Sequence, residues 1–270
     1  MPPEIFHGAK LKIKRANQHV YELNELLASF VKTDFCRFSV EKDASTGNHV
    51  LKFEMTKSAP CEVPLIIGDA IHNLRSALDL AACEIVTLGG ATPSKWCSFP
   101  FRDSRKELED TINGGEIKIA GADIVNLILD VVKPYKGGND PLCALHALDI
   151  TDKHKLLIPI FSIAALKHVN LRAGPMSMTD CTLAVGDGGK LNILAMPGKI
   201  EFEGYGEPAF AVLFDKGQVF ERQPVVPTLK QLSEVVSGVI QAIEKAYLAR
   251  EQGSGHGTPA PPKSPPTAEK

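Results

Sequence analysis

Hydrophobic residues recur at every third or fourth position along five segments of the chain, the spacing that gathers them on one face of an α-helix. The last of these segments shows the pattern with Leu229, Leu232, Val236, Val239 and Ile243. Helices are therefore predicted over residues 8–33, 64–88, 121–133, 141–157 and 226–248, with a shorter one from Arg105 to Ile112.

Alternating apolar and polar residues mark a second kind of segment. In residues 36–56, two alternating runs flank the turn-forming sequence DASTGN, which predicts a β-hairpin. Beyond Pro159 the helical period disappears, and short β-rich runs alternate with turns rich in Gly and Pro. The runs at 182–185, 191–195, 200–202 and 209–214 predict a small antiparallel sheet within residues 159–222.

These segments predict an α+β protein in which a helical core bundle is combined with a β-hairpin and a small antiparallel sheet. Residues 1–158 would form the helical core with its inserted hairpin, and residues 159–251 the sheet and a C-terminal helix packed on that core. Residues 252–270 are rich in Pro, Gly and Ser without aromatic residues, so a disordered tail is expected. The segment TPSKWCSFPFRDS is expected to be an ordered loop with covered rings.

Composition narrows the function classes. The 30 Lys and Arg residues nearly balance 32 Asp and Glu residues, so no global field would draw the chain to nucleic acid or an anionic membrane. The N-terminal residues lack the apolar run of a signal peptide, and no apolar stretch is long enough to span a bilayer. Six scattered cysteines without a C-x-x-C pair favour a reduced, cytoplasmic protein with neither a cysteine zinc site nor disulfides. The sequence is compatible with a homo-oligomer and points to no particular partner protein.

Two predicted helices carry matching polar stripes. In the helix at 64–88, the residues at i, i+3 and i+7 are His72, Arg75 and Asp79. In the helix at 141–157, the same spacing gives His146, Asp149 and Lys153. If the two helices face each other, an imidazole, a carboxylate and a cation from each would meet in one cluster.

Three interpretations of such a cluster are open. It could be an acid–base site, with histidine oriented by a carboxylate and Arg or Lys stabilising an anionic transition state. It could be a hydrogen-bond network that fixes which helices pair, because buried polar groups need partners whether or not anything reacts. The pairs Asp69-x-x-His72 and His146-x-x-Asp149 could also hold a metal between facing helices, although Arg75 and Lys153 would repel a cation.

The motif order GDAIHNLRSALDL, SFPF, KPY and LHALDITDKHKLL, within residues 64–158, resembles a widespread bacterial family that has no established activity. The usual Arg-x₄-His of that family is similar to the catalytic motif of HEPN-type helical ribonucleases of toxin and phage-defence systems, which are metal-independent. The resemblance assigns Arg75 to the phosphate-holding arginine. Leu80 stands where the catalytic histidine would be, which removes the key base from the motif.

The interpretation favoured by the sequence is therefore a structural network within a binding or scaffolding protein, without a cofactor. The first alternative is a HEPN-like ribonuclease, with RNA as its partner, His72 and His146 as acid–base groups, and Arg75 and Lys153 as phosphate binders. The second alternative is a metal-binding helical protein. Exposure discriminates among them, because a site needs an accessible histidine whereas a structural network should be sealed and fully paired.

Overall fold

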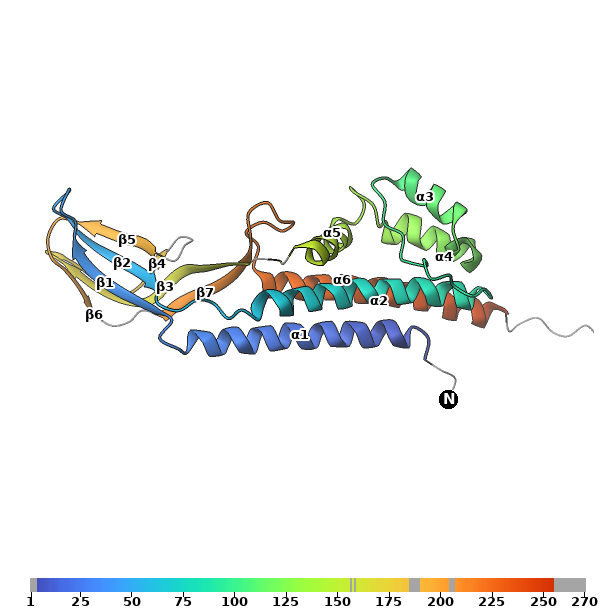
Figure 1. The fold of residues 1–270 in the computed structure, drawn as a ribbon, viewed down its shortest axis with the longest axis horizontal. Coiled ribbons are helices and arrows are strands. Elements are labelled where there is room, and N and C mark those ends of the chain that lie inside the picture. Colours follow the sequence, from blue (N-terminus) through green and yellow to red (C-terminus); the bar gives the residue numbers. More distant parts are fainter. Residues whose placement is uncertain (1–3, 156, 158, 185–189, 204–206, 255–270) are drawn as a thin grey trace, which may run out of the picture.

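The fold is α+β, as the sequence predicted. The computed structural model describes residues 4–155, 157, 159–184, 190–203 and 207–254. Figure 1 shows an elongated molecule with long helices along most of its length and the β-strands gathered at one end. The helices are α1 (His7–Val31), α2 (Val63–Leu88), α3 (Arg105–Gly114), α4 (Ala122–Asn126), α5 (Asp140–His154) and α6 (Val225–Ser254), with a 3₁₀ turn η1 (Ile117–Ala120) and a π-helical turn η2 (Leu127–Val132).

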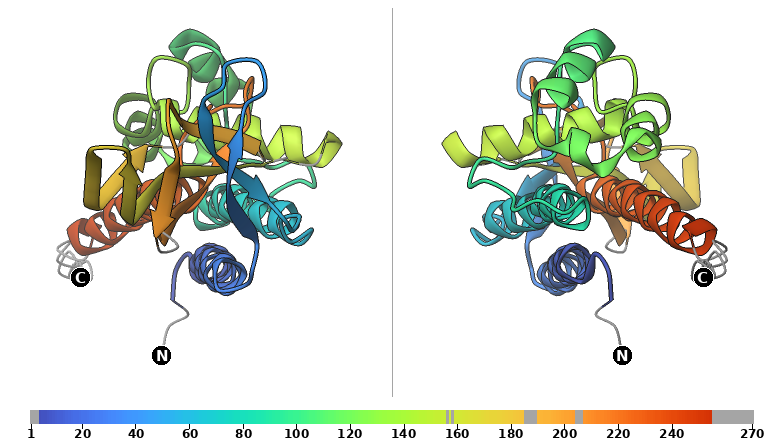
Figure 2. Two further views of the ribbon diagram at one scale, coloured as in Figure 1. Left: turned by 90° about the vertical axis from the view of Figure 1, so that its left-hand side faces the viewer. Right: turned by 90° about the vertical axis from the view of Figure 1, so that its right-hand side faces the viewer.

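The core lies around α2, which packs against α1 and α6 and also against α5 (Figure 2). Apolar residues therefore occupy more than one face of α2, and Leu74, Leu78 and Ile85 are wholly inaccessible. Polar contacts join α6 to the other long helices: the Tyr247 hydroxyl donates to the Ile85 carbonyl at 3.2 Å, and the Ser233 hydroxyl of α6 donates to Asn17 of α1 at 2.7 Å. These contacts fix the position of α2, and with it the position of the side chains on its polar face.

All strand pairs between the named strands are antiparallel, and they form two sheets. In the first sheet β2 lies between β1 and β5, and in the second β3 pairs with β4, β6 and β7. The hairpin expected at 36–56 is therefore extended by a strand from the C-terminal part of the chain. The strands are β1 (Cys36–Lys42), β2 (His49–Met55), β3 (Pro159–Ala173), β4 (Met176–Ala184), β5 (Lys190–Met196), β6 (Ile200–Glu203) and β7 (Glu207–Phe214).

The long strand β3 was not predicted, and the structure gives a physical reason. Its pairing register shifts between Ile163 and Ala165 and again on either side of Val169. Each irregularity changes which residues face the core, so the two-residue period that identifies a strand is lost from the sequence. β3 pairs with β7 along its first half and with β4 and β6 along its second half.

Several other predictions need correction. The Trp96 ring was expected to be covered, but the residue is 79% exposed, whereas Phe99 and Phe101 are buried. The helix expected at 121–133 changes to a π-helical turn at Leu127, and the helix expected to reach 157 ends at His154. α6 extends to Ser254, so the remainder of the expected tail, 255–270, lies outside the described residues.

Among the described residues, no helix is both long enough and apolar enough to span a bilayer.

Candidate functional site

The two predicted polar stripes meet where α5 packs across α2. Figure 2 shows the positions of the two helices. α5 begins with the Asn139 side chain accepting from the Leu142 N–H at 3.2 Å, followed by Pro141 in the first turn, which is a favourable helix start. Three pairs then join the helices: Gly68 with Asp152, His72 with Asp149, and Arg75 with His146. Successive pairs are about one helical turn apart. We call the polar cluster the six predicted residues that this crossing collects: His72, Arg75, Asp79, His146, Asp149 and Lys153.

Arg75 lies at the centre of the enclosed half of the polar cluster, which also contains Asp79 and His146. The residue is 7% exposed, and its Nε donates to His146 Nδ1 at 3.2 Å. One terminal nitrogen pairs with the Asp79 carboxylate, and the other lies 3.5 Å from the Phe99 carbonyl. Asp79 also accepts from the Phe99 N–H at 2.9 Å, so the same ion pair fastens the loop before α3. Each nitrogen of the guanidinium therefore has a partner within the chain.

The surroundings of His146 favour its neutral form. Its ring stacks on Phe101 with centroids 4.5 Å apart, and the Arg75 guanidinium lies over the same Phe101 ring at 4.7 Å. Because His146 Nδ1 accepts from Arg75, the proton of the neutral ring belongs on Nε2. Burial lowers the pKa of His146, and the positive charge of Arg75 lowers it further.

His72 forms the open half of the polar cluster. Its side chain is 53% exposed, and its Nδ1 lies 3.1 Å from the Asp149 carboxylate. Asp149 is itself 3% exposed and accepts from the Lys153 ammonium through its other oxygen at 2.6 Å. On the solvent side, His72 Nε2 lies 3.3 Å from the Ser76 hydroxyl. The buried Asp149 carboxylate thus orients the imidazole of His72, whose opposite edge remains accessible to solvent.

Gly68 sets how closely the helices approach. A Cβ placed on Gly68 would lie 2.6 Å from Asp152 Oδ1 and 2.7 Å from its Cγ, closer than real side chains come. A larger residue here would force the Asp152 carboxyl to move away from α2. Burial raises the pKa of Asp152, and the charges of Asp149 and Asp69 raise it further.

The metal interpretation receives no support from the geometry. Across the described ranges, no group of three or more His, Cys, Asp or Glu side chains is arranged to hold a metal ion. The nitrogen of His146 that could bind a metal from the cluster side accepts from Arg75 instead, and Lys153 occupies Asp149. The side chains of Arg75 and Lys153 therefore occupy the ligand atoms that a metal ion would need.

Comparison with known proteins gives no relative. No protein-family model matches this chain, and neither the curated proteins nor the solved structures contain a match. The resemblance drawn from the sequence motifs thus stays a prediction, and function has to be argued from the residues themselves.

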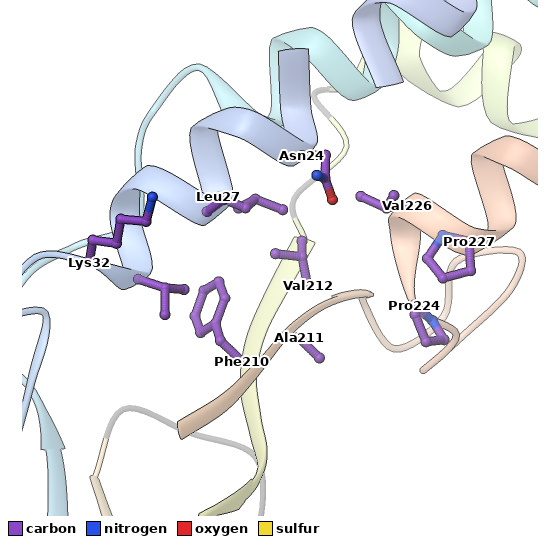
Figure 3. Close-up of a pocket in the computed structure, with 11 residues that line it drawn as sticks. Asn24, Leu27, Lys32, Phe210, Ala211, Val212, Pro224, Val226 and Pro227 are labelled. Carbon is purple, nitrogen blue, oxygen red and sulfur yellow. The ribbon is translucent and has the colours of Figure 1, made fainter. Parts of the chain in front are cut away.

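A second candidate site lies at the junction between the long helices and the strands. An apolar groove with a volume of about 660 Å³ runs between the end of α1, β7 and the start of α6. Figure 3 shows Leu27, Phe210, Val212 and Val226 lining it, with Asn24 pointing into the space between Leu27 and Val226. The remaining lining residues are Ala28, Val31, Lys32, Ala211, Pro224 and Pro227.

Sequence reasoning missed two parts of these sites. Ser76 stands four residues after His72, one helical turn away, and that spacing was the available signal for its contact with the imidazole. The groove had no local signal, because its walls come from three segments that are far apart along the chain.

Proposed function

We propose that this chain is a binding protein in which the polar cluster fixes α2 against α5 and the junction groove takes the ligand. The observation that carries the first part is the enclosure of Arg75, which is 7% exposed with its guanidinium partnered by Asp79, His146 and Phe99. An arginine that recognises a phosphate has to present its N–H groups to the ligand. Arg75 would have to abandon several buried contacts to do so.

The groove has the composition of a small-molecule site. Ligand sites are mostly apolar concavities of about 300–1,000 Å³ with a few polar groups that orient the ligand. Here the polar groups are Asn24 on α1 and Lys32, the residue that directly follows α1. Among the described residues, no ion pair engages the Lys32 ammonium, which favours an anionic partner. The ligand class that fits is an apolar chain or ring ending in a carboxylate.

Calorimetric titration with decanoate, and with decanol as the uncharged control, tests this assignment. We expect decanoate to bind, and Lys32→Ala to raise its Kd about tenfold, the size of one charge-assisted contact, without changing the Kd of decanol. Val31→Asp should abolish binding of both, whereas Lys42→Ala on β1 should change neither. Absence of binding by both ligands, or unchanged binding to Val31→Asp, would refute the groove as the ligand site.

Metal-independent RNA cleavage is the second candidate, and one observation favours it. His72 is exposed and oriented by a buried carboxylate, with the Lys153 ammonium beside that carboxylate. Arg75 and His146 are engaged with each other, so this alternative rests on His72 as the base and Lys153 as the phosphate binder.

The direct test is incubation of the purified protein with mixed RNA, with and without a chelator. The ribonuclease proposal expects cleavage that resists the chelator and is lost in His72→Ala but retained in His7→Ala, which changes an exposed histidine far from the cluster along the chain. Intact RNA after incubation with wild-type protein would end this candidate.

A further inference from the structure

The open half of the polar cluster contains a chain of three groups that neither proposed function uses in full. The Asp149 carboxylate lies 3.1 Å from His72 Nδ1, and His72 Nε2 lies 3.3 Å from the Ser76 hydroxyl. Asp149 comes from α5, whereas His72 and Ser76 are one turn apart on α2. Carboxylate, imidazole and hydroxyl therefore follow one another in the order that activates a serine nucleophile.

The partners of His72 favour one direction for each hydrogen bond. Asp149 is buried, and its second oxygen accepts from the Lys153 ammonium at 2.6 Å. A carboxylate paired with an ammonium group acts as an acceptor. His72 Nδ1 therefore donates to Asp149. Its Nε2 then carries the lone pair and accepts the Ser76 proton. This is the tautomer that a general base requires.

We propose that Ser76 is an acyl-accepting nucleophile, with His72 as its general base and Asp149 as the residue that positions His72. The imidazole is half exposed and lies at the surface of the α2–α5 crossing. Small, activated carboxylic esters are the substrate class that reaches such an open site without a deep pocket.

The reaction balances with an ester and water alone. As the Ser76 oxygen forms a bond to the acyl carbon, its proton passes to His72 Nε2. The ester C–O bond then breaks, and the leaving oxygen takes that proton from His72. Water hydrolyses the acyl-serine by the same route in reverse, which returns the free Ser76 hydroxyl and releases the carboxylic acid.

The helix around Ser76 also limits the rate. In the interior of an α-helix the backbone N–H groups are engaged in intrahelical hydrogen bonds, so they offer no oxyanion hole of the kind that speeds deacylation. The acyl-serine should therefore form once per chain and accumulate. A stoichiometric covalent product is the appropriate readout, in preference to steady-state turnover.

The experiment is incubation of the full chain with p-nitrophenyl acetate, followed by intact mass measurement and peptide mapping. We expect one acetyl group on Ser76 in the wild-type protein. Ser76→Ala and His72→Ala should lose it, and Asp149→Asn should slow its appearance about a hundredfold, within the usual range for acid–base assistance. Ser237→Ala is the matched control, because Ser237 is a half-buried helical serine on α6. This variant should be acetylated on Ser76 as fast as the wild-type protein.

Circular dichroism and urea unfolding of each variant establish that it is folded. Absence of an acetyl group on Ser76 in the wild-type protein, or equal acetylation of Ser76 in folded His72→Ala, would overturn the proposal. Acetylation confined to lysines or to the N-terminus would overturn it as well. Because decanoate binding is measured at the groove, the two proposals can fail independently.

Discussion

The two halves of the polar cluster use the same residue types in opposite ways. Around Arg75, a buried cation is enclosed by Asp79, His146 and the Phe99 carbonyl. Around His72, the carboxylate is the buried member, and the imidazole and ammonium that it binds are more than half exposed. The first arrangement buries the guanidinium with a partner on each nitrogen, whereas the second holds one side of an imidazole and leaves the other accessible. Whether such a pair acts as a structural contact or as a potential reactive site therefore depends on which of its members is buried.

The largest effect is expected from Arg75→Ala. Removing the buried guanidinium takes the cation from Asp79, which is 36% exposed, and the hydrogen-bond donor from His146 Nδ1, and it also removes the packing on Phe101. We expect a loss of roughly 2–4 kcal/mol. The free energy of unfolding from urea titration measures this loss. A loss below about 1 kcal/mol would mean that the enclosed half does not hold the helices together.

Gly68→Ala comes next. At an ordinary helical position this change stabilises by up to about 1 kcal/mol. Here the added methyl group would displace the Asp152 carboxyl, so we expect this gain to be cancelled and the protein to be destabilised by about 1 kcal/mol. The double variant with Asp152→Ala should recover most of the loss, and additive losses in that variant would contradict the close approach described here.

The pH dependence of stability isolates His146. Its folded pKa lies below the unfolded value of 6.5, so the unfolded chain binds more protons between these two values. The contribution of His146 to stability is therefore present above pH 6.5 and is lost as the pH falls through the folded pKa. Asp152, whose pKa is raised above 3.8, acts in the opposite direction at lower pH.

Urea unfolding of wild type and His146→Gln at a series of pH values separates the two groups. The difference in unfolding free energy between the proteins should shrink as the pH falls below 6.5. A difference that stays constant over this range would show that His146 titrates alike in the folded and unfolded chains.

Lys153→Ala should have a small effect. The lysine bonds a buried carboxylate, but its own side chain is 54% exposed and His72 remains as a partner of Asp149, so we expect a loss of about 1 kcal/mol. Lys155→Ala, just beyond the end of α5, provides the control in the same urea titration. A loss as large as that of Arg75→Ala would place Lys153 in the enclosed half of the cluster.

The sequence predicted the helical part of this fold more closely than the sheets. The boundaries of α2 were predicted within one residue, because its apolar period is regular and Gly89 follows it. β3 was missed because its register shifts remove the alternation on which a strand prediction depends. Pairing of β5 with β2 joins segments more than a hundred residues apart, and no local pattern encodes such a contact.

For the candidate site, the shared spacing of His72, Arg75 and Asp79 with His146, Asp149 and Lys153 was sufficient to predict which residues gather. It could not predict the exposure of each one. That depends on the Phe99–Phe101 loop, which covers Arg75 and stacks on His146 but leaves His72 open. The burial of a polar group is decided by what packs over it, and this information comes from a different part of the chain.

Urea unfolding of His72→Ala tests the division of the cluster most directly. Because His72 is more than half exposed and Lys153 still pairs with the buried Asp149 carboxylate, we predict a loss of about 1 kcal/mol, well below that of Arg75→Ala, together with loss of acetylation at Ser76. A loss of stability comparable with that of Arg75→Ala would contradict the account, because His72 would then belong to the structure that holds α2 against α5.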